Sequence, residues 1–192
     1  MKNVLIIESN PVTNSFNGTL AEAYRKGALA AGADVRVIHL NEMRFDPNLS
    51  GGYRDKMPLE PDLLEAQELI KWAEHIVFVY PIWWGGPPAL LKGFLDRILQ
   101  PGFGFKYKKG SPLPEQLLKG RTARLITTMD GPHWYFKFIQ GQPGHNMMKN
   151  SILRFCGIKP IGITAVGQVG KLSAERRHSW AGKIERLGQR LR

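Results

Sequence analysis

Short apolar runs and longer amphipathic stretches alternate along the chain. Apolar residues dominate positions 4–7, 35–40, 77–80, 123–128 and 161–166. Short runs of this kind are typical of strands that are buried on both faces, as in a parallel sheet. The stretches between them carry apolar residues three or four positions apart, which is the spacing of a helix with one buried face. The pattern therefore predicts an α/β fold with a doubly wound, five-stranded parallel sheet in the strand order 2-1-3-4-5.

Helical spacing fills the segments between these strands. We expect Gly32 to end the first helix, Ser173 to cap the last one, and another helix to run from about residue 146 to 155. The apolar positions expected to face the core are Leu20, Tyr24, Ala28 and Ala31, then Leu63, Ala66, Ile70 and Ala73, then Leu90, Leu91, Phe94, Leu95 and Ile98, and last Trp180, Ile184, Leu187 and Leu191.

Two segments break the periodicity. Residues 41–61 contain several prolines and glycines, and we expect a long loop that is functional or mobile. Residues 99–112 place Phe103, Phe105 and Tyr107 among glycines, which favours an exposed loop over an edge strand. No internal repeat or linker divides the 192 residues, so one domain spanning residues 1–192 is predicted.

Two adjacent tryptophans, Trp83 and Trp84, follow the third strand in the sequence Pro-Ile-Trp-Trp-Gly-Gly-Pro-Pro. The glycines and prolines make a loop at the carboxyl end of a central strand, where open α/β sheets bind their ligands. One tryptophan in a loop is commonly a lid over the core. Two adjacent ones cannot both point inward, so at least one is expected to face a planar partner.

The loop after the first strand offers a second candidate site. It contains Ser9, Asn10, Thr13, Asn14, Ser15 and Asn17 and leads into a helix. Hydroxyls, amides and backbone N–H groups at a helix N-terminus form an anion site, most naturally for phosphate. The alternative, left open by the loop alone, is that Ser15 or Asn17 only caps the helix. The loop matches neither GxGxxG nor GxxxxGK[ST], which argues against a dinucleotide-binding Rossmann fold and a P-loop nucleotidase.

Composition narrows the function classes. Hydrophobic residues make up 43% and charged residues 22% of the chain, as in ordinary globular proteins. The single Cys156 lies among apolar residues, so we interpret it as a buried hydrophobic side chain in a protein of the reducing cytoplasm. The apolar run at the N-terminus is too short for a signal peptide or a membrane span. No metal-ligand pattern is present.

The net charge of +11 fits nucleic acid, an acidic surface or anionic small molecules, and basic residues are dense from Lys171 to Arg192. No nucleic-acid-binding motif accompanies the charge, so neither a nucleic-acid partner nor membrane insertion is predicted. Two other classes of protein with such a sheet are excluded, each by a single residue. A small phosphatase needs a cysteine in the first loop, and a response regulator needs an aspartate where Pro81 stands.

Several of these segments together resemble one family. Ser15-Phe16-Asn17, the stretch from Pro81 to Arg97, Thr127-Thr128 and residues 152–157 resemble the NAD(P)H:quinone oxidoreductases of the flavodoxin-like fold, over nearly the whole chain. The resemblance implies a homodimer with a non-covalent FAD or FMN at each interface site. It also implies hydride transfer from NAD(P)H to the flavin and two-electron reduction of a quinone or similar acceptor, with the chemistry supplied by the flavin.

The resemblance also assigns residues to the cofactor. The flavin phosphate would be held by Ser15, Phe16 and Asn17, and the ring would be followed by Pro81, Ile82, Trp83, Trp84 and Gly85. The ring and ribityl chain would be contacted by Thr127, Thr128, Met129 and Asp130, and the nucleotide end would lie near Arg177.

The resemblance assigns further residues to the substrate and the chemistry. The substrate pocket would be lined by Phe105 and Tyr107 from the partner subunit and by Trp134. Charge would be relayed to the reduced ring by Tyr135 and His145.

This chain departs from the family pattern at Met129 and Asp130, where relatives often have two glycines. The Ser-Phe-Asn loop and Arg177 favour FAD, with FMN as the alternative. A second function is also compatible with the sequence: some relatives are ancillary subunits of potassium-efflux systems, and the basic surface would suit docking to an acidic protein partner.

Overall fold

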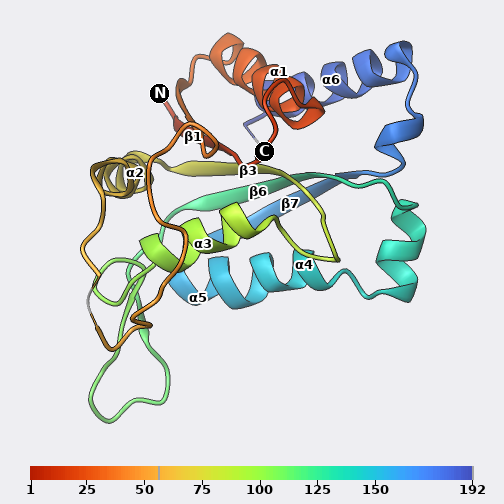
Figure 1. The fold of residues 1–192 in the computed structure, drawn as a ribbon. Helices are drawn as coiled ribbons and strands as arrows, with labels where there is room; N and C mark the ends of the chain where they lie inside the picture. The colour runs from red at the N-terminus through yellow and green to blue at the C-terminus, as the bar shows by residue number, and fades with distance from the viewer. Residues whose placement is uncertain (56, 192) are drawn as a thin grey trace.

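The computed structural model describes residues 1–55 and 57–191. Lys56, in the predicted long loop, and Arg192, the last basic residue, lie outside the described residues. Five parallel strands form the central sheet in the order β2-β1-β3-β6-β7 (Figure 1). They are β1 (Asn3–Glu8), β2 (Asp34–His39), β3 (His75–Pro81), β6 (Thr122–Thr128) and β7 (Lys159–Val166). Renumbered without the short β4 and β5, this is the predicted order 2-1-3-4-5, which is confirmed.

Helices cover both faces of the sheet (Figure 1). α1 (Phe16–Ala30) and α6 (Ala174–Gln189) pack together on one face; α2 (Pro61–Trp72), α3 (Ala89–Ile98), α4 (Pro143–Asn146), the π-helix η2 (Met147–Leu153) and α5 (Arg154–Cys156) belong to the other. The short π-helix η1 (Tyr135–Ile139) and 3₁₀-helix η3 (Val169–Lys171) complete the elements. The helix predicted at about 146–155 is therefore longer and π-wound in its middle.

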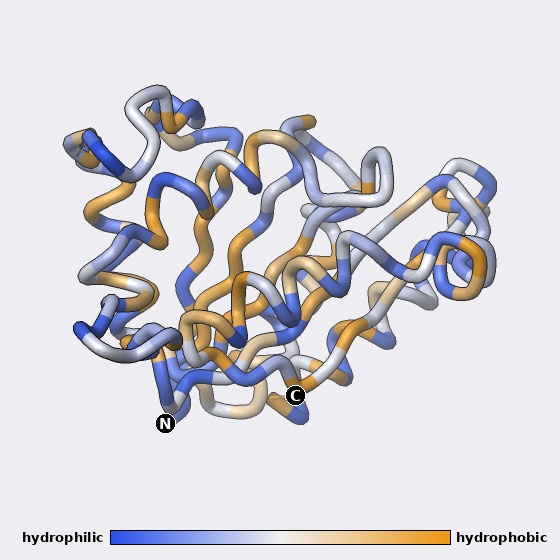
Figure 2. Tube along the Cα trace, turned by 90° about the horizontal axis from the view of Figure 1, so that it is seen from below, coloured by the Kyte–Doolittle hydropathy of each residue, from blue (hydrophilic) through white to orange (hydrophobic). Residues whose placement is uncertain are grey.

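The buried strands hold the two layers together. All seven residues of β3 are buried, as the unbroken apolar run predicts. Phe78 and Tyr80 belong to the core under α2 and α3, whereas Val77 and Val79 belong to the core under α1 and α6. Hydrophobic segments accordingly run through the strands in the middle of the molecule (Figure 2). Ser173 caps α6 as predicted.

Two expectations about exposure are wrong. Phe103 and Phe105 are buried, because their segment folds back and β4 (Phe105–Lys106) pairs with β5 (Glu115–Gln116) in a small antiparallel sheet. Of the three aromatic residues in this segment, only Tyr107 is exposed as predicted, with 70% of its surface accessible. Ala31, predicted on the buried face of the first helix, is exposed, since α1 ends one residue before it.

A buried arginine orders the long loop between β2 and α2. Arg97 of α3 is fully buried, pairs with Glu60 at 2.7 Å and donates hydrogen bonds to the backbone oxygens of Asp46 and Pro58. The described residues of this loop therefore have a defined path without a helix or strand. Removing one partner of such a pair costs about 3–5 kcal/mol, because the other charge stays buried.

Within the described residues, no helix is both long enough and apolar enough to cross a membrane. The same part of the chain has no group of three or more His, Cys, Asp or Glu side chains placed to hold a metal ion. Cys156 is buried as predicted, and burial raises the pKa of its thiol to about 11. A protonated, enclosed thiol of this kind is chemically inert.

Candidate active site

Three loops meet at the carboxyl edge of the sheet, because β1, β3 and β6 are neighbours and parallel. The loop after β1 is joined to β3 by the Ser9 N–H, which donates to the Val79 oxygen at 2.9 Å. The loop after β3 is joined to β6 by the Ile82 N–H, which donates to the Thr128 oxygen at 2.7 Å. The predicted phosphate loop, tryptophan loop and threonine loop thus lie side by side.

The loop after β1 places the N-terminus of α1 at this edge. The Ser15 side chain accepts a hydrogen bond from the Gly18 N–H at 3.1 Å, so Ser15 is the helix cap. Asn14 has a left-handed backbone, with φ of 54°, a conformation that asparagine tolerates well. Of the two residues considered as caps, Ser15 caps the helix, whereas the Asn17 side chain makes other contacts.

Asn17 is the centre of a buried polar network. Its Oδ1 accepts hydrogen bonds from the Thr128 hydroxyl at 2.9 Å and from the Asn10 amide at 3.1 Å. Its own amide nitrogen is buried and has no hydrogen-bond partner in the described residues. An unsatisfied buried donor is unfavourable by about 1–3 kcal/mol. A ligand oxygen would remove that penalty.

The Asn17 side chain lines a cavity of about 210 Å³, which we call the asparagine cavity. Its walls are Asn10, Phe16, Asn17, Pro81, Ile82, Trp83, Thr128, Met129, Asp130, Val169 and Arg177. Nine of the thirteen residues predicted to bind the cofactor are therefore brought together around one space: Phe16, Asn17, Pro81, Ile82, Trp83, Thr128, Met129, Asp130 and Arg177.

A second, larger cavity of about 690 Å³ adjoins the first, which we call the tryptophan cavity. It is lined by Ile82, Trp83, Trp84, Gly85, Met129, Asp130, Gly131, Pro132, Tyr135, Phe136, Gln140 and Pro143. Four residues, Ile82, Trp83, Met129 and Asp130, line both cavities. The site is therefore a small polar chamber that continues into a broad aromatic one.

The tryptophan loop is a tight two-residue turn. Trp83 and Gly86 exchange backbone hydrogen bonds of 2.8 and 2.9 Å, and Trp84 and Gly85 both have positive φ, 50° and 79°. Two positive φ values define a type I′ turn, which favours Asn or Gly at both positions. Trp84 therefore holds an unfavourable conformation while its ring is fully exposed. The Gly144 N–H donates to the Gly85 oxygen at 2.7 Å and fixes the turn to α4.

Thr127 and His145 lie one layer behind the cavities, and neither side chain lines them. The Thr127 hydroxyl is 2.9 Å from His145 Nε2, and the His145 ring meets Phe136 edge to face. Burial, with minor contributions from His133 and Lys149, lowers the pKa of His145 to about 4. The imidazole is therefore neutral at pH 7. Tyr135, by contrast, lines the tryptophan cavity directly.

Arg177 forms one wall of the asparagine cavity. Its guanidinium lies over the Phe16 ring at 5.0 Å and donates to the Val169 oxygen at 2.8 Å and, more weakly, to the Leu172 oxygen at 3.4 Å. Asp130 lies on the neighbouring wall, where its carboxylate accepts a hydrogen bond from the Gly170 N–H at 3.2 Å. One positive and one negative side chain thus border the same chamber.

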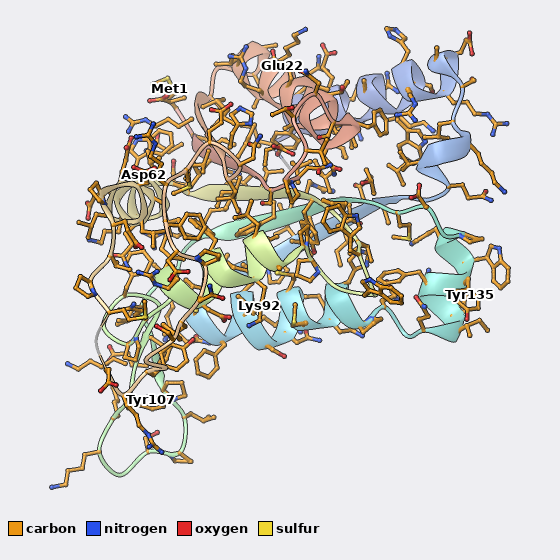
Figure 3. The ribbon with its side chains drawn as sticks, viewed as in Figure 1. Met1, Glu22, Asp62, Lys92, Tyr107 and Tyr135 are labelled. Atoms are coloured by element: carbon orange, nitrogen blue, oxygen red, sulfur yellow. The ribbon has the colours of Figure 1, made fainter. Side chains whose placement is uncertain are left out.

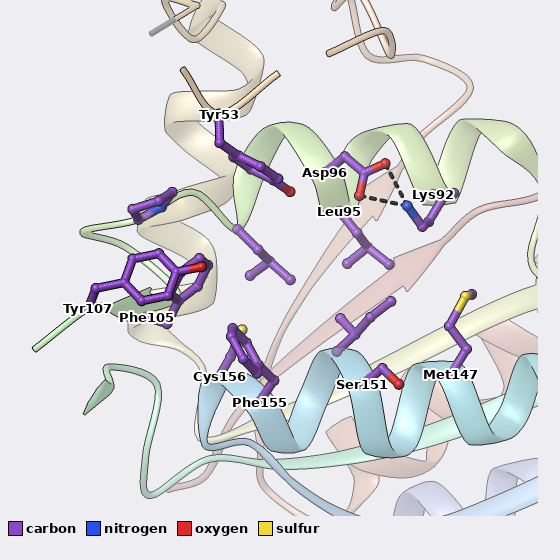
Figure 4. Close-up of a pocket in the computed structure, with 13 residues that line it drawn as sticks. Tyr53, Lys92, Leu95, Asp96, Phe105, Tyr107, Met147, Ser151, Phe155 and Cys156 are labelled. Atoms are coloured by element: carbon purple, nitrogen blue, oxygen red, sulfur yellow. Dashed lines mark hydrogen bonds and ion pairs between the residues drawn. The ribbon is translucent and has the colours of Figure 1, made fainter. Parts of the chain in front are cut away.

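Phe105 and Tyr107 line a different cavity, of about 370 Å³, which we call the α3–α5 cavity (Figure 4). Tyr53 of the long loop, Lys92 and Asp96 of α3, and Phe155 and Cys156 of α5 share its walls. Tyr107 and Tyr135 lie at opposite ends of the molecule (Figure 3). Trp134 is exposed beside Tyr135, with ring centroids 5.9 Å apart, and does not line the tryptophan cavity.

Sequence reasoning missed several wall residues. Asn10 was only one of many loop amides, although its spacing of seven from Asn17 places both near the helix start. Gln140 and Pro143 face the tryptophan cavity from a segment without a recognisable motif. Tyr53 belongs to a loop whose path depends on Arg97, far away in the sequence.

Comparison with known proteins agrees with this geometry. A family model described as flavodoxin-like fold matches residues 2–191. An uncharacterized NAD(P)H oxidoreductase of Haemophilus influenzae is 30% identical over 172 residues, 87% of this chain and 84% of the relative. The mouse (Mus musculus) ribosyldihydronicotinamide dehydrogenase [quinone] is 27% identical, over 97% of this chain and 92% of the relative. The crystal structure of Smu.1420 from Streptococcus mutans UA159 superposes with a TM-score of 0.83 at 30% identity, covering 98% and 99% of the two chains.

Relatives named as an NAD(P)H oxidoreductase and a quinone dehydrogenase, together with an aromatic cavity beside a polar one at the edge of this sheet, indicate an oxidoreductase. The chain belongs to the flavodoxin-like fold family, among its NAD(P)H:quinone oxidoreductases. The resemblance noted from the sequence, the predicted fold and the predicted enzyme class are confirmed.

Proposed function

We propose that the protein binds a flavin across the asparagine and tryptophan cavities and uses it to reduce quinones or similar small acceptors with NAD(P)H. The observation that carries the proposal is the buried Asn17 amide nitrogen. Its N–H groups have no acceptor in the described residues, which indicates a ligand oxygen. The adjoining tryptophan cavity has the aromatic walls and the size that suit a planar ring system.

The phosphate and ribityl oxygens would lie in the asparagine cavity. The N-terminus of α1 supplies backbone N–H groups and a positive helix end there, and Asn17 supplies its free amide. The ring would lie in the tryptophan cavity, between the turn at Trp83 and the loop from Met129 to Pro132. These residues fit the chemistry of a flavin mononucleotide: polar donors at one end and aromatic side chains at the other.

When bound, the flavin supplies the redox chemistry, taking a hydride from NAD(P)H and passing two electrons to the acceptor. The protein residues supply position and polarity. Tyr135 presents a phenol at the cavity wall and is proposed to donate a hydrogen bond where negative charge gathers on the reduced ring. His145 is proposed to act from behind, as a positioning residue that holds Thr127 and Phe136.

FMN suits the site better than the FAD expected from the sequence. The FAD prediction depends on Arg177 as a partner for the second phosphate. Two nitrogens of that guanidinium already donate to backbone oxygens, and its face covers Phe16. Ser15 lines a separate cavity whose walls include three carboxylates, Glu8, Glu22 and Glu42. These carboxylates would repel a further phosphate. We therefore propose FMN.

We further propose a homodimer in which each active site uses both chains. Phe105 and Tyr107 lie far from Tyr135 in the same chain, so they reach a tryptophan cavity only from another copy. In this dimer, a two-fold axis would place the α3–α5 faces of the two chains against each other in antiparallel orientation. The Tyr107 end of each chain would then lie at the Tyr135 end of its partner. The exposed rings of Trp84, Trp134 and Tyr107 would then gain apolar contacts.

The proposal is tested on purified protein. Its visible spectrum is expected to have the two bands of oxidised flavin, and heat should release FMN in a one-to-one ratio to chain. Under anaerobic conditions NADH or NADPH should bleach the spectrum, and a quinone should restore it. A colourless protein that takes up neither FMN nor FAD would contradict the proposal, and release of FAD would correct its choice of cofactor.

A further inference from the structure

One wall residue of the tryptophan cavity carries a charge. Among the twelve described residues that line this cavity, Asp130 is the only Asp, Glu, Lys or Arg; the others are apolar or neutral. Asp130 follows β6 at the carboxyl edge of the sheet, and it lines the asparagine cavity as well. Its carboxylate therefore stands where the two cavities join.

The carboxylate is held in place. The Gly170 N–H donates to Asp130 Oδ1 at 3.2 Å, which joins the loop after β6 to the helix η3. A single hydrogen bond from a neutral amide orients a carboxylate without removing its charge. Within the described residues, the second carboxylate oxygen has no hydrogen-bond donor, and Asp130 is exposed.

Arg177 and Lys137 do not line this cavity. Arg177 lines only the asparagine cavity, where it is engaged with the Val169 oxygen and the Phe16 ring. The Lys137 ammonium lies over the Phe138 ring at 5.1 Å, outside the lining of the tryptophan cavity. The chain as a whole has a net charge of +11. Asp130 therefore supplies the charge in the described lining of the tryptophan cavity, and charges more than about 8 Å away are largely screened at physiological salt.

We propose that Asp130 sets the charge selectivity of the acceptor site: acceptors with an anionic group are disfavoured relative to neutral or cationic acceptors of the same ring system. The inference rests on the proposed function, because it concerns the molecule that enters the tryptophan cavity. An exposed carboxylate a few ångströms from an acceptor's charge changes the acceptor's binding by roughly three- to tenfold. The expected substrates are therefore neutral or cationic quinones, in spite of the basic surface.

The test compares Asp130→Asn with the wild-type holoenzyme on 1,4-naphthoquinone, its 2-sulfonate and a quaternary-ammonium derivative. Intrinsic reactivity cancels when kcat/KM of the variant is divided by kcat/KM of the wild type for each acceptor. This ratio should be three- to tenfold higher for the sulfonate than for the neutral quinone, and lower for the cation. Glu65→Gln, on exposed α2 at the far end of the molecule, makes the same change in net charge and should give equal ratios (Figure 1).

Two further variants and a binding measurement complete the test. Asp130→Glu keeps the charge and should keep the wild-type selectivity, and Asp130→Gly replaces Asp130→Asn if the latter does not fold. Equilibrium binding of redox-inert 2-naphthalenesulfonate, compared with 2-naphthol by calorimetry, gives a readout independent of turnover, and removing the carboxylate should strengthen only the sulfonate.

Ratios within twofold for all three acceptors, or unchanged sulfonate binding, would overturn the assignment while leaving the proposed function standing. Failure to bind flavin or to reduce the neutral quinone would instead remove the proposed function. In that case the calorimetric comparison alone decides whether Asp130 repels anions from the cavity.

Discussion

At the scale of single residues, Asn17 is the side chain on which ligand binding depends most. Its oxygen is held by two donors, Thr128 and Asn10, so the amide orientation is fixed and the nitrogen is directed away from both. The nitrogen remains buried without a partner in the described residues. A donor fixed in this way is preorganised for an acceptor, which lowers the entropy lost on binding.

Asn17→Asp isolates the role of this amide. The substitution keeps the volume and both accepted hydrogen bonds but replaces the donors with an anion that faces the proposed phosphate. We expect FMN to bind about 10- to 100-fold more weakly, the value of one or two hydrogen bonds to a charged group. Fluorescence titration of the flavin-free protein measures this. Asn150→Asp, on an exposed residue, is the matched control; equal affinity in both variants would contradict the assignment.

Trp84 holds a backbone conformation that its side chain does not favour. Trp84→Asn should raise the free energy of unfolding by about 0.5–1 kcal/mol, because asparagine tolerates positive φ in a type I′ turn. Quinone turnover should fall, since a wall of the tryptophan cavity is lost. Urea unfolding and steady-state rates measure the two effects. Trp84→Phe should keep most of the turnover without added stability. A Trp84→Asn variant that is less stable than wild type and fully active would contradict both expectations.

At the scale of elements, the strands and main helices were predictable because each is bounded by local signals. The apolar run in β3 ends at Pro81, and α6 begins after Ser173. The π-helical winding of η2 and the pairing of β4 with β5 depend on contacts between distant segments, so periodicity did not predict them. The burial of Phe105 was missed for the same reason.

His145 connects two elements, since its ring joins Thr127 of β6 to α4. Its pKa is lowered by burial to about 4 in the folded protein, against 6.5 for an ordinary histidine. Between these two pKa values the unfolded chain binds a proton at His145 that the folded chain does not bind. The free energy of unfolding must therefore fall as the pH drops from about 6.5 to 4. For one histidine the loss is about 3 kcal/mol.

His145→Asn should make this acid loss smaller. Urea unfolding at pH 7 and pH 4 gives the free energy of unfolding for wild type and variant, and the wild type should lose about 3 kcal/mol more than the variant. His178→Asn, on the exposed side of α6, serves as control and should lose as much as the wild type. Parallel losses in wild type and His145→Asn would show that His145 does not titrate in this way.

At the scale of the whole molecule, the sequence predicted which loops meet but not how their residues divide between cavities. Strand order alone places Asn17, Trp83 and Thr128 at one edge. Thr127, adjacent to Thr128 in the sequence, points to the opposite side and contacts His145, as alternation along a strand requires. The separation of Tyr107 from Tyr135 depends on the full path of the chain and was accessible only from the resemblance to the family.

The proposed dimer makes a direct prediction about mass and activity. Light scattering should give twice the chain mass of 21.6 kDa. Tyr107→Ala should slow quinone reduction while FMN remains bound, because the exposed ring would act in the partner's site rather than at the flavin phosphate. Tyr53→Phe, which keeps the ring in the α3–α5 cavity, is the control. A fully active monomer would rule out a shared site.

The most direct test of the central claim, that one flavin lies across the asparagine and tryptophan cavities, is a titration of FMN into the flavin-free protein. We predict that flavin fluorescence is quenched by the tryptophan walls and that quenching saturates at one FMN per chain. Fluorescence that stays equal to that of free FMN at every ratio would contradict the account.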